Sequence, residues 1–286
     1  MPTTCQINFE NNAQKIVYSG QKLHITVRLK LTEEINVRSL HIHGTAHVEF
    51  FQDDKKRNGY YTADENVLDI RKCLSGGNGK IQVLPLGTHD YSCTCNLPRN
   101  IPSSFSGAYG HIKYTANVVL GISLRPDETF EEKFHVFKSV NLNDYPSLQA
   151  EVLDHHTRKL LAHEEFQISI STRLPARGYA CGQSINLEIR LNNRSRFHVD
   201  SVIVYMLRHT VYLRSAHSKH KKTEDVIVTR NMFDWKCKYM TTEVFHGSIR
   251  VPTMIPPTDT ETNKIIKIGY SLSIRAFFLR KEVAIS

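Results

Sequence analysis

Polar and apolar residues alternate along much of this chain of 286 residues. The clearest run is Lys22–Leu31, in which every second residue is apolar, and residues 186–191 repeat the pattern. A period of two predicts β-strands that bury one face. The same alternation recurs at residues 111–118, 133–137, 167–171, 202–207 and 266–274. No segment has the pattern of an amphipathic helix of three turns, so an all-β fold is predicted.

Two blocks of this pattern occur twice, in the same order. Gly20-Gln21 opens the clearest run, and Gly182-Gln183 opens its repeat 162 residues later. The second block, Leu-Pro-x-x-Ile-Pro at residues 97–102, recurs as Val-Pro-x-x-Ile-Pro at residues 251–256. Ordered repetition predicts two copies of one domain. We interpret the Gly-Gln pairs and the turn residues as structural motifs of the scaffold: Gly20, Gln21, Pro98, Pro102, Gly107, Gly182, Gln183, Pro252 and Pro256.

The repeat predicts two tandem antiparallel β-sandwich domains. We expect the first sandwich at residues 1–145, a linker at 146–162 and the second sandwich at 163–286. About 20 residues follow Val118 before the last alternating run of the first copy is complete, whereas only 12 follow Ile274 in the second. The second sandwich is therefore expected to lack its final strand. Either the chain is a truncated product, or another segment or molecule fills the place.

Composition is that of an ordinary soluble protein. Hydrophobic residues make up 40% and charged residues 23% of the chain. No run approaches the ~18 apolar residues of a membrane span, and residues 1–10 lack the pattern of a secretory signal. We expect a cytoplasmic protein that can also associate peripherally with the plasma membrane or endosomes. In a reducing compartment most of the six scattered cysteines should be free thiols.

Positive charge is concentrated in the second half. Residues 1–146 carry 16 Lys and Arg against 15 Asp and Glu, while residues 147–286 carry 21 against 13. Such an excess favours acidic partners: phosphorylated or acidic tails, an anionic lipid surface, or nucleic acid. The best candidates for partner binding are Arg194, Arg196, Arg214, Lys219, Lys221 and Lys222. The alternative is an ordinary solvated loop, and nucleic acid is disfavoured because stacking aromatics are sparse among these cations.

Several short motifs resemble those of a known protein family. They are Phe9-Glu10-Asn11-Asn12 before Tyr18-Ser19-Gly20-Gln21, Leu86-Gly87-Thr88-His89-Asp90-Tyr91, Gly110-His111-Ile112-Lys113-Tyr114, Asn141-Leu142-Asn143, and Pro256-Pro257-Thr258. In this order and spacing, the chain resembles the alpha-arrestins, the arrestin-domain-containing proteins, over essentially its whole length.

The resemblance implies the arrestin fold and the work of an adaptor rather than an enzyme. Alpha-arrestins bind cytoplasmic segments of membrane receptors and transporters, and they act in protein transport, endocytic sorting and ubiquitination. They recruit HECT-type ubiquitin ligases through Pro-Pro-x-Tyr motifs in a C-terminal tail. This sequence departs from that pattern, since its only Pro-Pro, Pro256-Pro257, precedes Thr258-Asp259. Ligase recruitment is therefore expected only indirectly or through a missing tail.

Candidate chemistry elsewhere in the sequence is weak. No nucleophile elbow, phosphate loop, dinucleotide fingerprint or His-Glu-x-x-His motif occurs, so neither catalysis nor a cofactor is expected. His41-x-His43 could place two imidazoles on one strand face, but we assign no metal site. We interpret Cys93-x-Cys95 as core-filling thiols. One family member pairs with thioredoxin through a cysteine, so redox-linked partner binding through Cys237 or Cys181 is the alternative function.

Overall fold

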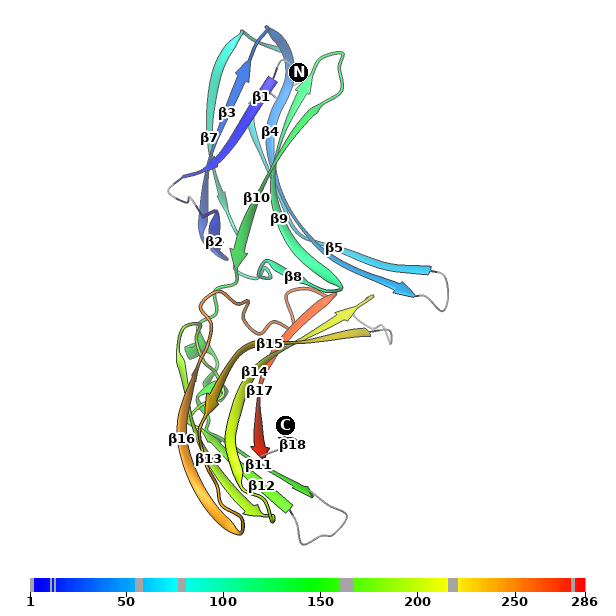
Figure 1. Ribbon diagram of the computed structural model, residues 1–286. Helices are drawn as coiled ribbons and strands as arrows, with labels where there is room; N and C mark the ends of the chain where they lie inside the picture. Colours follow the sequence, from blue (N-terminus) through cyan, green and yellow to red (C-terminus); the bar gives the residue numbers. More distant parts are fainter. Residues whose placement is uncertain are drawn as a thin grey trace. The chain divides into compact units, whose positions relative to one another are not determined.

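The computed structural model describes residues 3–10, 12, 14–54, 59–76, 81–159, 167–215, 221–278 and 281–285. Within these ranges every regular element is a β-strand, except for two short 3-10 helices, η1 (Leu142–Asp144) and η2 (Pro146–Gln149) (Figure 1). The prediction of an all-β protein is confirmed. None of the described helices is long and apolar enough to cross a membrane.

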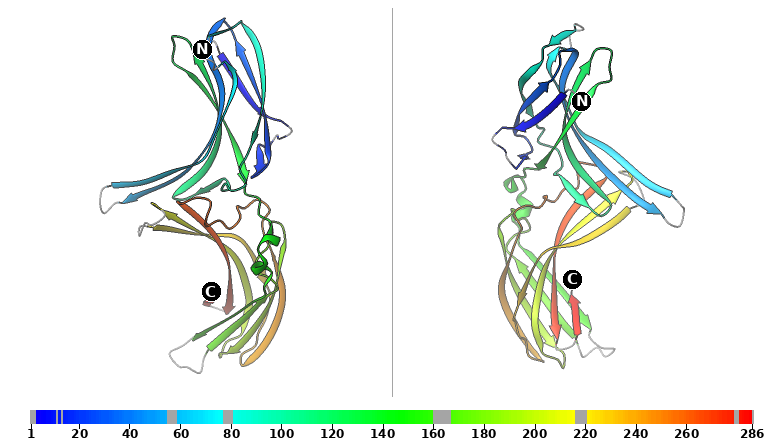
Figure 2. Two further views of the ribbon diagram at one scale, coloured as in Figure 1. Left: turned by 180° about the vertical axis from the view of Figure 1, so that it is seen from behind. Right: turned by 45° about the horizontal axis from the view of Figure 1, so that its top comes forward.

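The first sandwich consists of two sheets. One has the order β1 (Thr3–Phe9), β3 (Lys22–Leu31), β7 (Gly87–Asn96). The other has the order β2 (Ile16–Tyr18), β10 (Glu128–Phe137), β9 (Gly110–Ile122), β4 (Ile35–Asp54), β5 (Gly59–Gly76), with β6 (Gln82–Leu84) on β4 and β8 (Phe105–Gly107) on β9. Figure 2 shows β4 and β5 continuing past the rest of their sheet as a two-stranded ribbon. Apolar residues at every second position of β3 are 0–5% exposed, and this face forms the core.

The second sandwich also consists of two sheets. One has the order β11 (Val152–Lys159), β12 (Gln167–Leu174), β13 (Ser184–Arg194), β16 (Thr241–Arg250). The other has the order β15 (Lys221–Phe233), β14 (Val199–Leu213), β17 (Ile266–Phe278), β18 (Lys281–Ile285). Alternating apolar residues of β12, β13, β14 and β17 form its core. Two sandwiches are what the repeat predicts, although β2 and β10 of the first sandwich pair in parallel rather than antiparallel.

The chain divides into two compact units that interleave along the sequence. The first comprises residues 1–139, 210–223 and 256–268, and the second residues 140–209, 224–255 and 269–286. The boundaries expected from the repeat, residues 1–145, 146–162 and 163–286, stay a prediction.

The Gly-Gln pairs form the same turn in both copies. Gly20 and Gly182 have φ angles of +82° and +81°, a conformation that favours glycine. The Gln21 side chain accepts a hydrogen bond from the Tyr18 amide at 3.1 Å, and Gln183 accepts one from the Ala180 amide at 2.9 Å. The main chain of each Gly-Gln pair also bonds the segment that carries the Pro motif of its own copy. Pro102 has a further role, because its carbonyl accepts a 2.6 Å bond from the buried Tyr114 hydroxyl.

The second sandwich is expected to lack its final strand, but the structure has a short strand, β18, at that place. β18 pairs antiparallel with β17 over five residues, from Lys281 opposite Phe278 to Ile285 opposite Ile274. In the first copy β10 pairs with β9 over seven residues, at the corresponding side of the strand. Repeat spacing underestimated the second copy because only two residues separate β17 from β18 along the sequence, whereas five separate β9 from β10.

Candidate functional site

The predicted basic residues lie at the two ends of β14. Arg194 and Arg196 are exposed before the strand begins, and Arg214 and Lys221 are exposed after it ends. The fifteen residues of β14, at about 3.3 Å each, separate the two groups by roughly 50 Å along the strand. Lys222 is half-buried, with its ammonium 5.9 Å from the centre of the Tyr109 ring. Lys219 lies outside the described residues. The structure therefore brings these cations together as two groups rather than one.

A buried polar network builds the turn that carries Arg194 and Arg196. Asn193 and Ser195 are fully buried, and the Asn193 amide donates to the carbonyl oxygens of Phe197 at 2.8 Å and Lys238 at 3.1 Å. The Ser195 hydroxyl donates to the Asn193 side-chain oxygen at 2.5 Å. Asn193 and Ser195 are thus held inside, while Arg194 at the end of β13 and Arg196 in the following bend are exposed.

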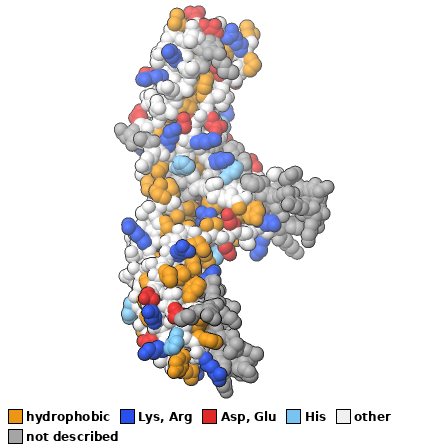
Figure 3. Space-filling model, viewed as in Figure 1, with side chains coloured by type: hydrophobic (Ala, Val, Ile, Leu, Met, Phe, Trp, Pro, Cys, Tyr) orange, Lys and Arg blue, Asp and Glu red, His pale blue; other side chains and the backbone are white. Residues whose placement is uncertain are grey.

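Exposed apolar side chains stand beside these arginines. Phe197, Tyr239 and Met240 are 54%, 55% and 68% exposed. The His198 ring contacts the Tyr239 ring at 5.1 Å, and the backbone of Val199 pairs with that of Cys237, which joins the two turns. We call Arg194, Arg196, Phe197, Tyr239 and Met240 the tip cluster. Over the face drawn in Figure 3, by contrast, acidic and basic side chains are interspersed.

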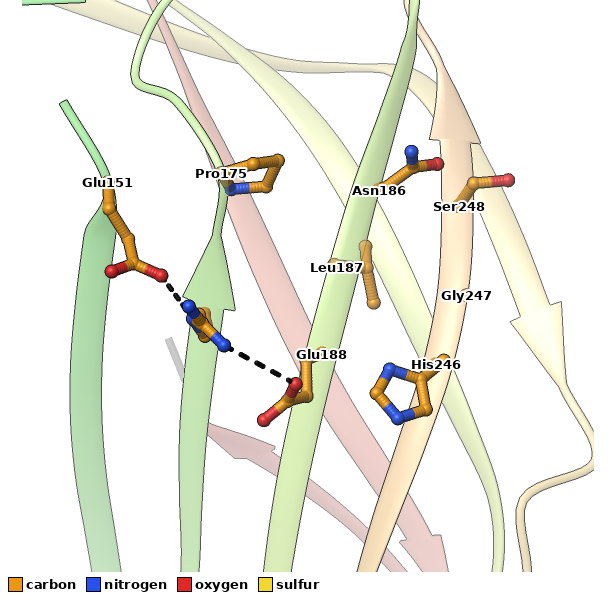
Figure 4. Close-up of a pocket in the computed structure, with 9 residues that line it drawn as sticks. Glu151, Pro175, Asn186, Leu187, Glu188, His246, Gly247 and Ser248 are labelled. Atoms are coloured by element: carbon orange, nitrogen blue, oxygen red, sulfur yellow. Dashed lines mark hydrogen bonds and ion pairs between the residues drawn. The ribbon is translucent and has the colours of Figure 1, made fainter. Parts of the chain in front are cut away.

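A row of charged side chains crosses the outer face of the β11–β12–β13–β16 sheet (Figure 4). Arg173, Glu188 and His246 are cross-strand neighbours in register. The Arg173 guanidinium pairs with Glu151 and reaches Glu188 at 4.0 Å. The row borders a hollow of about 500 Å³ that is also lined by Pro175, Asn186, Leu187, Gly247 and Ser248. The hollow offers charge for binding, but no activated nucleophile.

The structure also contains an Asp-His-Ser arrangement that no sequence pattern indicates. His209 Nδ1 lies 2.7 Å from Asp225 Oδ1, and His209 Nε2 lies 2.6 Å from Ser271 Oγ. The three residues are side by side on β15, β14 and β17, and no motif marks them because only the strand register brings them together. A hydrolytic triad also needs an oxyanion hole. The three side chains stand on neighbouring strands of one sheet, and we interpret the row as structural.

The histidine and cysteine motifs are also placed. His43 Nε2 lies 2.7 Å from Asp69 Oδ1, while burial and the nearby Arg71 lower the pKa of His41. Across the described part of the chain, no three His, Cys, Asp or Glu side chains converge as metal ligands. Cys93 and Cys95 lie on the face of β7 that points into the first sandwich. Cys181 is exposed, with its sulfur 3.7 Å from the Ile255 carbonyl.

Cys237 lies in the core of the second sandwich. It is 1% exposed, and burial raises the pKa of its thiol. Because the thiolate is the reactive form, such a thiol is a poor nucleophile. The geometry therefore disfavours Cys237 as the centre of a redox-linked partner site.

Comparison with known proteins identifies the family. The Arrestin (or S-antigen), N-terminal domain matches residues 5–143, and the Arrestin (or S-antigen), C-terminal domain matches residues 165–286. Arrestin domain-containing protein 17 of Caenorhabditis elegans is 22% identical over 281 residues, which cover 92% of this chain and 65% of that protein. Thioredoxin-interacting protein of Sus scrofa is 24% identical over 252 residues, covering 84% and 64% of the two chains.

A human relative gives the same picture. Arrestin domain-containing protein 1 of Homo sapiens is 23% identical over 266 residues, covering 91% of this chain and 58% of that protein. The chain thus spans less than two thirds of the length of these curated relatives. The resemblance to the alpha-arrestins is confirmed, and with it the arrestin β-sandwich fold. The chain belongs to the arrestin family, as a distant relative of the arrestin domain-containing proteins.

Proposed function

We propose that this protein is an adaptor of alpha-arrestin type that binds cytoplasmic segments of membrane receptors or transporters for endocytic sorting and ubiquitination. The observation that carries the proposal is the match of both arrestin domains, in order, along the chain. Its work is binding, with no bond made or broken. Proximity labelling in cells is expected to recover membrane proteins and endocytic factors, and their absence would contradict the proposal.

We place cargo binding at β15 and its basic end. β15 is an edge strand, so one side of its backbone is open to an added extended peptide. Arg214 and Lys221 are exposed at the end where β15 begins. An extended cargo segment would pair with the strand, while its acidic or phosphorylated residues meet these cations.

Two matched double substitutions test this location. Arg214→Glu with Lys221→Glu reverses the charge beside β15, and Arg194→Glu with Arg196→Glu makes the same change in charge at the other end of β14. With a doubly phosphorylated peptide as the probe, fluorescence anisotropy of the full chain is expected to give about tenfold weaker binding for the first pair. The second pair should match the unsubstituted protein, and equal losses in both would reject β15 as the site.

Ligase recruitment is proposed to be indirect, or to use a segment outside these 286 residues. The sequence has no Pro-Pro-x-Tyr, since Thr258 and Asp259 follow its only Pro-Pro. A pull-down of the 286-residue chain with isolated WW domains is therefore expected to be negative. Mass spectrometry of the endogenous protein would show whether this chain is a truncated regulatory product.

A second candidate is docking to an anionic lipid surface through the tip cluster. Its aromatic and Met side chains are more than half exposed beside two arginines, a combination suited to a headgroup interface. Substituting Phe197, Tyr239 and Met240 by Ser is expected to abolish sedimentation with phosphatidylserine vesicles. Substituting the exposed Ile81 and Val83 by Ser is the control. Binding that survives the triple substitution would count against lipid docking.

The redox-linked alternative is based on Cys237 or Cys181. Cys237 is buried and Cys181 is exposed, so Cys181 is the accessible thiol of these two. A thioredoxin variant without its resolving cysteine would trap a mixed disulfide if this alternative holds. Loss of that adduct in Cys181→Ser, with retention in Cys73→Ser, would assign it, whereas no adduct at all favours the adaptor without redox chemistry.

A further inference from the structure

Two thiols share one face of β7 at the edge of the first sandwich. Cys93 and Cys95 are separated by one residue, and both face inward, opposite Ile25 and Leu23 of β3. Cys95 is 6% exposed, whereas Cys93 is half-buried. We call them the Cys93–Cys95 pair, and nothing in the proposed adaptor function uses it.

An exposed cation, Lys72, lies near enough to this pair to act on it. β7 and β5 are edge strands of the two facing sheets, and the Tyr91 hydroxyl of β7 hydrogen-bonds to Ser75 of β5. Lys72 of β5 pairs with Ile42 of β4, which is a core residue. Directly paired residues share a face, so the Lys72 side chain is on the inner face of its sheet, at the edge strand. Its positive charge acts on both thiols.

The two thiols also act on each other. A hydrogen bond from Cys93, helped by Lys72, outweighs burial and lowers the pKa of Cys95 to about 7. The same hydrogen bond and burial raise the pKa of Cys93.

We propose that the Cys93–Cys95 pair binds one Cu(I) ion between its two sulfur atoms. Soft thiolates select Cu(I), which is stable with two ligands. Among the described residues no third His, Cys, Asp or Glu side chain joins the pair, which disfavours Zn²⁺ and its four-ligand geometry. Both S–H bonds break, two Cu–S bonds form, and two protons pass to solvent without a change of oxidation state. The resulting bis-thiolate unit carries one negative charge, which Lys72 offsets.

Strand geometry favours a bridging ion over a disulfide. With two metal–sulfur bonds of about 2.3 Å in line, one ion spans two sulfurs roughly 4.6 Å apart. A disulfide needs about 2.0 Å between sulfurs, and residues two apart on a strand have Cα atoms about 6.7 Å apart, at the limit that a disulfide tolerates. Oxidation would have to bend β7, whereas metal binding leaves it extended.

Competition with a chromogenic chelator tests the site. The full chain, reduced and kept without oxygen, is titrated with Cu(I) in the presence of bathocuproine disulfonate. The unsubstituted protein is expected to withdraw one equivalent from the chelator. Cys93→Ser and Cys95→Ser should each weaken binding on the order of a hundredfold, and Lys72→Met about tenfold with unchanged stoichiometry. Cys73→Ser combined with Cys181→Ser is the control, because both cysteines are exposed and lie outside the pair.

The outcomes separate cleanly. Loss in both pair variants with retention in the control supports the site. Unchanged binding in Cys93→Ser, whose half-buried position makes it the safer variant for folding, overturns it. Zn²⁺ bound as tightly, and with the same dependence on Cys93 and Cys95, would reveal a third ligand and overturn the two-ligand assignment.

Discussion

Gly247 is a position in the second sandwich where packing leaves no room for a side chain. A Cβ atom there would lie 2.7 Å from Trp235 and 2.8 Å from Phe233. The Trp235 ring stacks between Phe233, at 4.1 Å, and Phe245, at 5.1 Å, over the core. The glycine is therefore needed for the aromatic stack rather than for a turn.

Gly247→Ala is expected to destabilise the protein by about 1–3 kcal/mol, because the rings must shift from their stacked positions. Urea unfolding followed by Trp235 fluorescence measures this change. Gly269→Ala is the matched control, since a Cβ atom at that strand glycine meets nothing within 4 Å. Equal stability of the two variants would show that the stack adapts freely.

Asp259 is a buried carboxylate whose partners lie within the first compact unit. It is 6% exposed, accepts hydrogen bonds from the Thr262 side chain and amide, and lies 3.3 Å from the Lys138 ammonium. Burial alone would raise the pKa of Asp259. The bonds from Thr262, the charge of Lys138 and a bond from the Glu261 amide outweigh burial and hold the pKa below its ordinary value.

A lowered folded-state pKa fixes the direction of the pH dependence. The carboxylate stabilises the fold above the unfolded-state pKa of about 3.9, and this contribution is lost as pH falls through the lower folded-state pKa. Asp259→Asn is thus expected to cost about 2 kcal/mol at pH 7 and progressively less below pH 4. Unfolding free energies of both proteins between pH 3 and 7 test this, and a constant difference would contradict it.

The Asp225–His209–Ser271 row belongs to three neighbouring strands. The hydrogen-bond distances match a hydrolytic triad, but the His209 and Asp225 side chains are 38% and 63% exposed, so the row is open to water. A fluorophosphonate probe is therefore expected to leave Ser271 unmodified, with the same labelling in Ser271→Ala. Selective labelling that disappears in Ser271→Ala would revive the possibility of acyl-transfer chemistry.

Alternation predicted the strands well because burial of one face dictates it. β3 follows Lys22–Leu31 to the residue, and β13 and β17 include the runs found by pattern. Contacts across strands could not be predicted in this way, since register is set by packing between segments far apart in sequence. His209 is 16 residues from Asp225 and 62 from Ser271. The five described cations of the predicted set fall into two groups because β14 lies between them.

Some strands contribute residues to both compact units. β14 and β17 each run from one unit into the other. In the first unit the fully buried Tyr212 ring lies 5.6 Å from Tyr109 and 6.4 Å from Phe105. Residues of the second repeat therefore complete the apolar packing of the first.

An isolated fragment of residues 1–145 is expected to melt at a lower temperature than the full chain and to bind a hydrophobic dye, because Phe105 and Tyr109 lose Tyr212. Tyr212→Ala in the full chain should cost about 3 kcal/mol. Tyr145→Ala, at a ring that is 53% exposed, serves as the control. A fragment as stable as the full chain would mean that the first sandwich folds alone.

The buried amide of Asn193 has a consequence for how the protein can be produced. Asn193-Arg194-Ser195 is an acceptor sequence for N-linked glycans, which attach to the side-chain nitrogen. That nitrogen is enclosed and donates to Phe197 and Lys238. If an added leader sent the chain through the secretory pathway, a sugar could be added only before folding, and the modified turn could not close. Removing Ser195 would abolish the acceptor sequence but also the hydroxyl that ties Asn193 in place. Recombinant production thus belongs in a compartment without oligosaccharyltransferase.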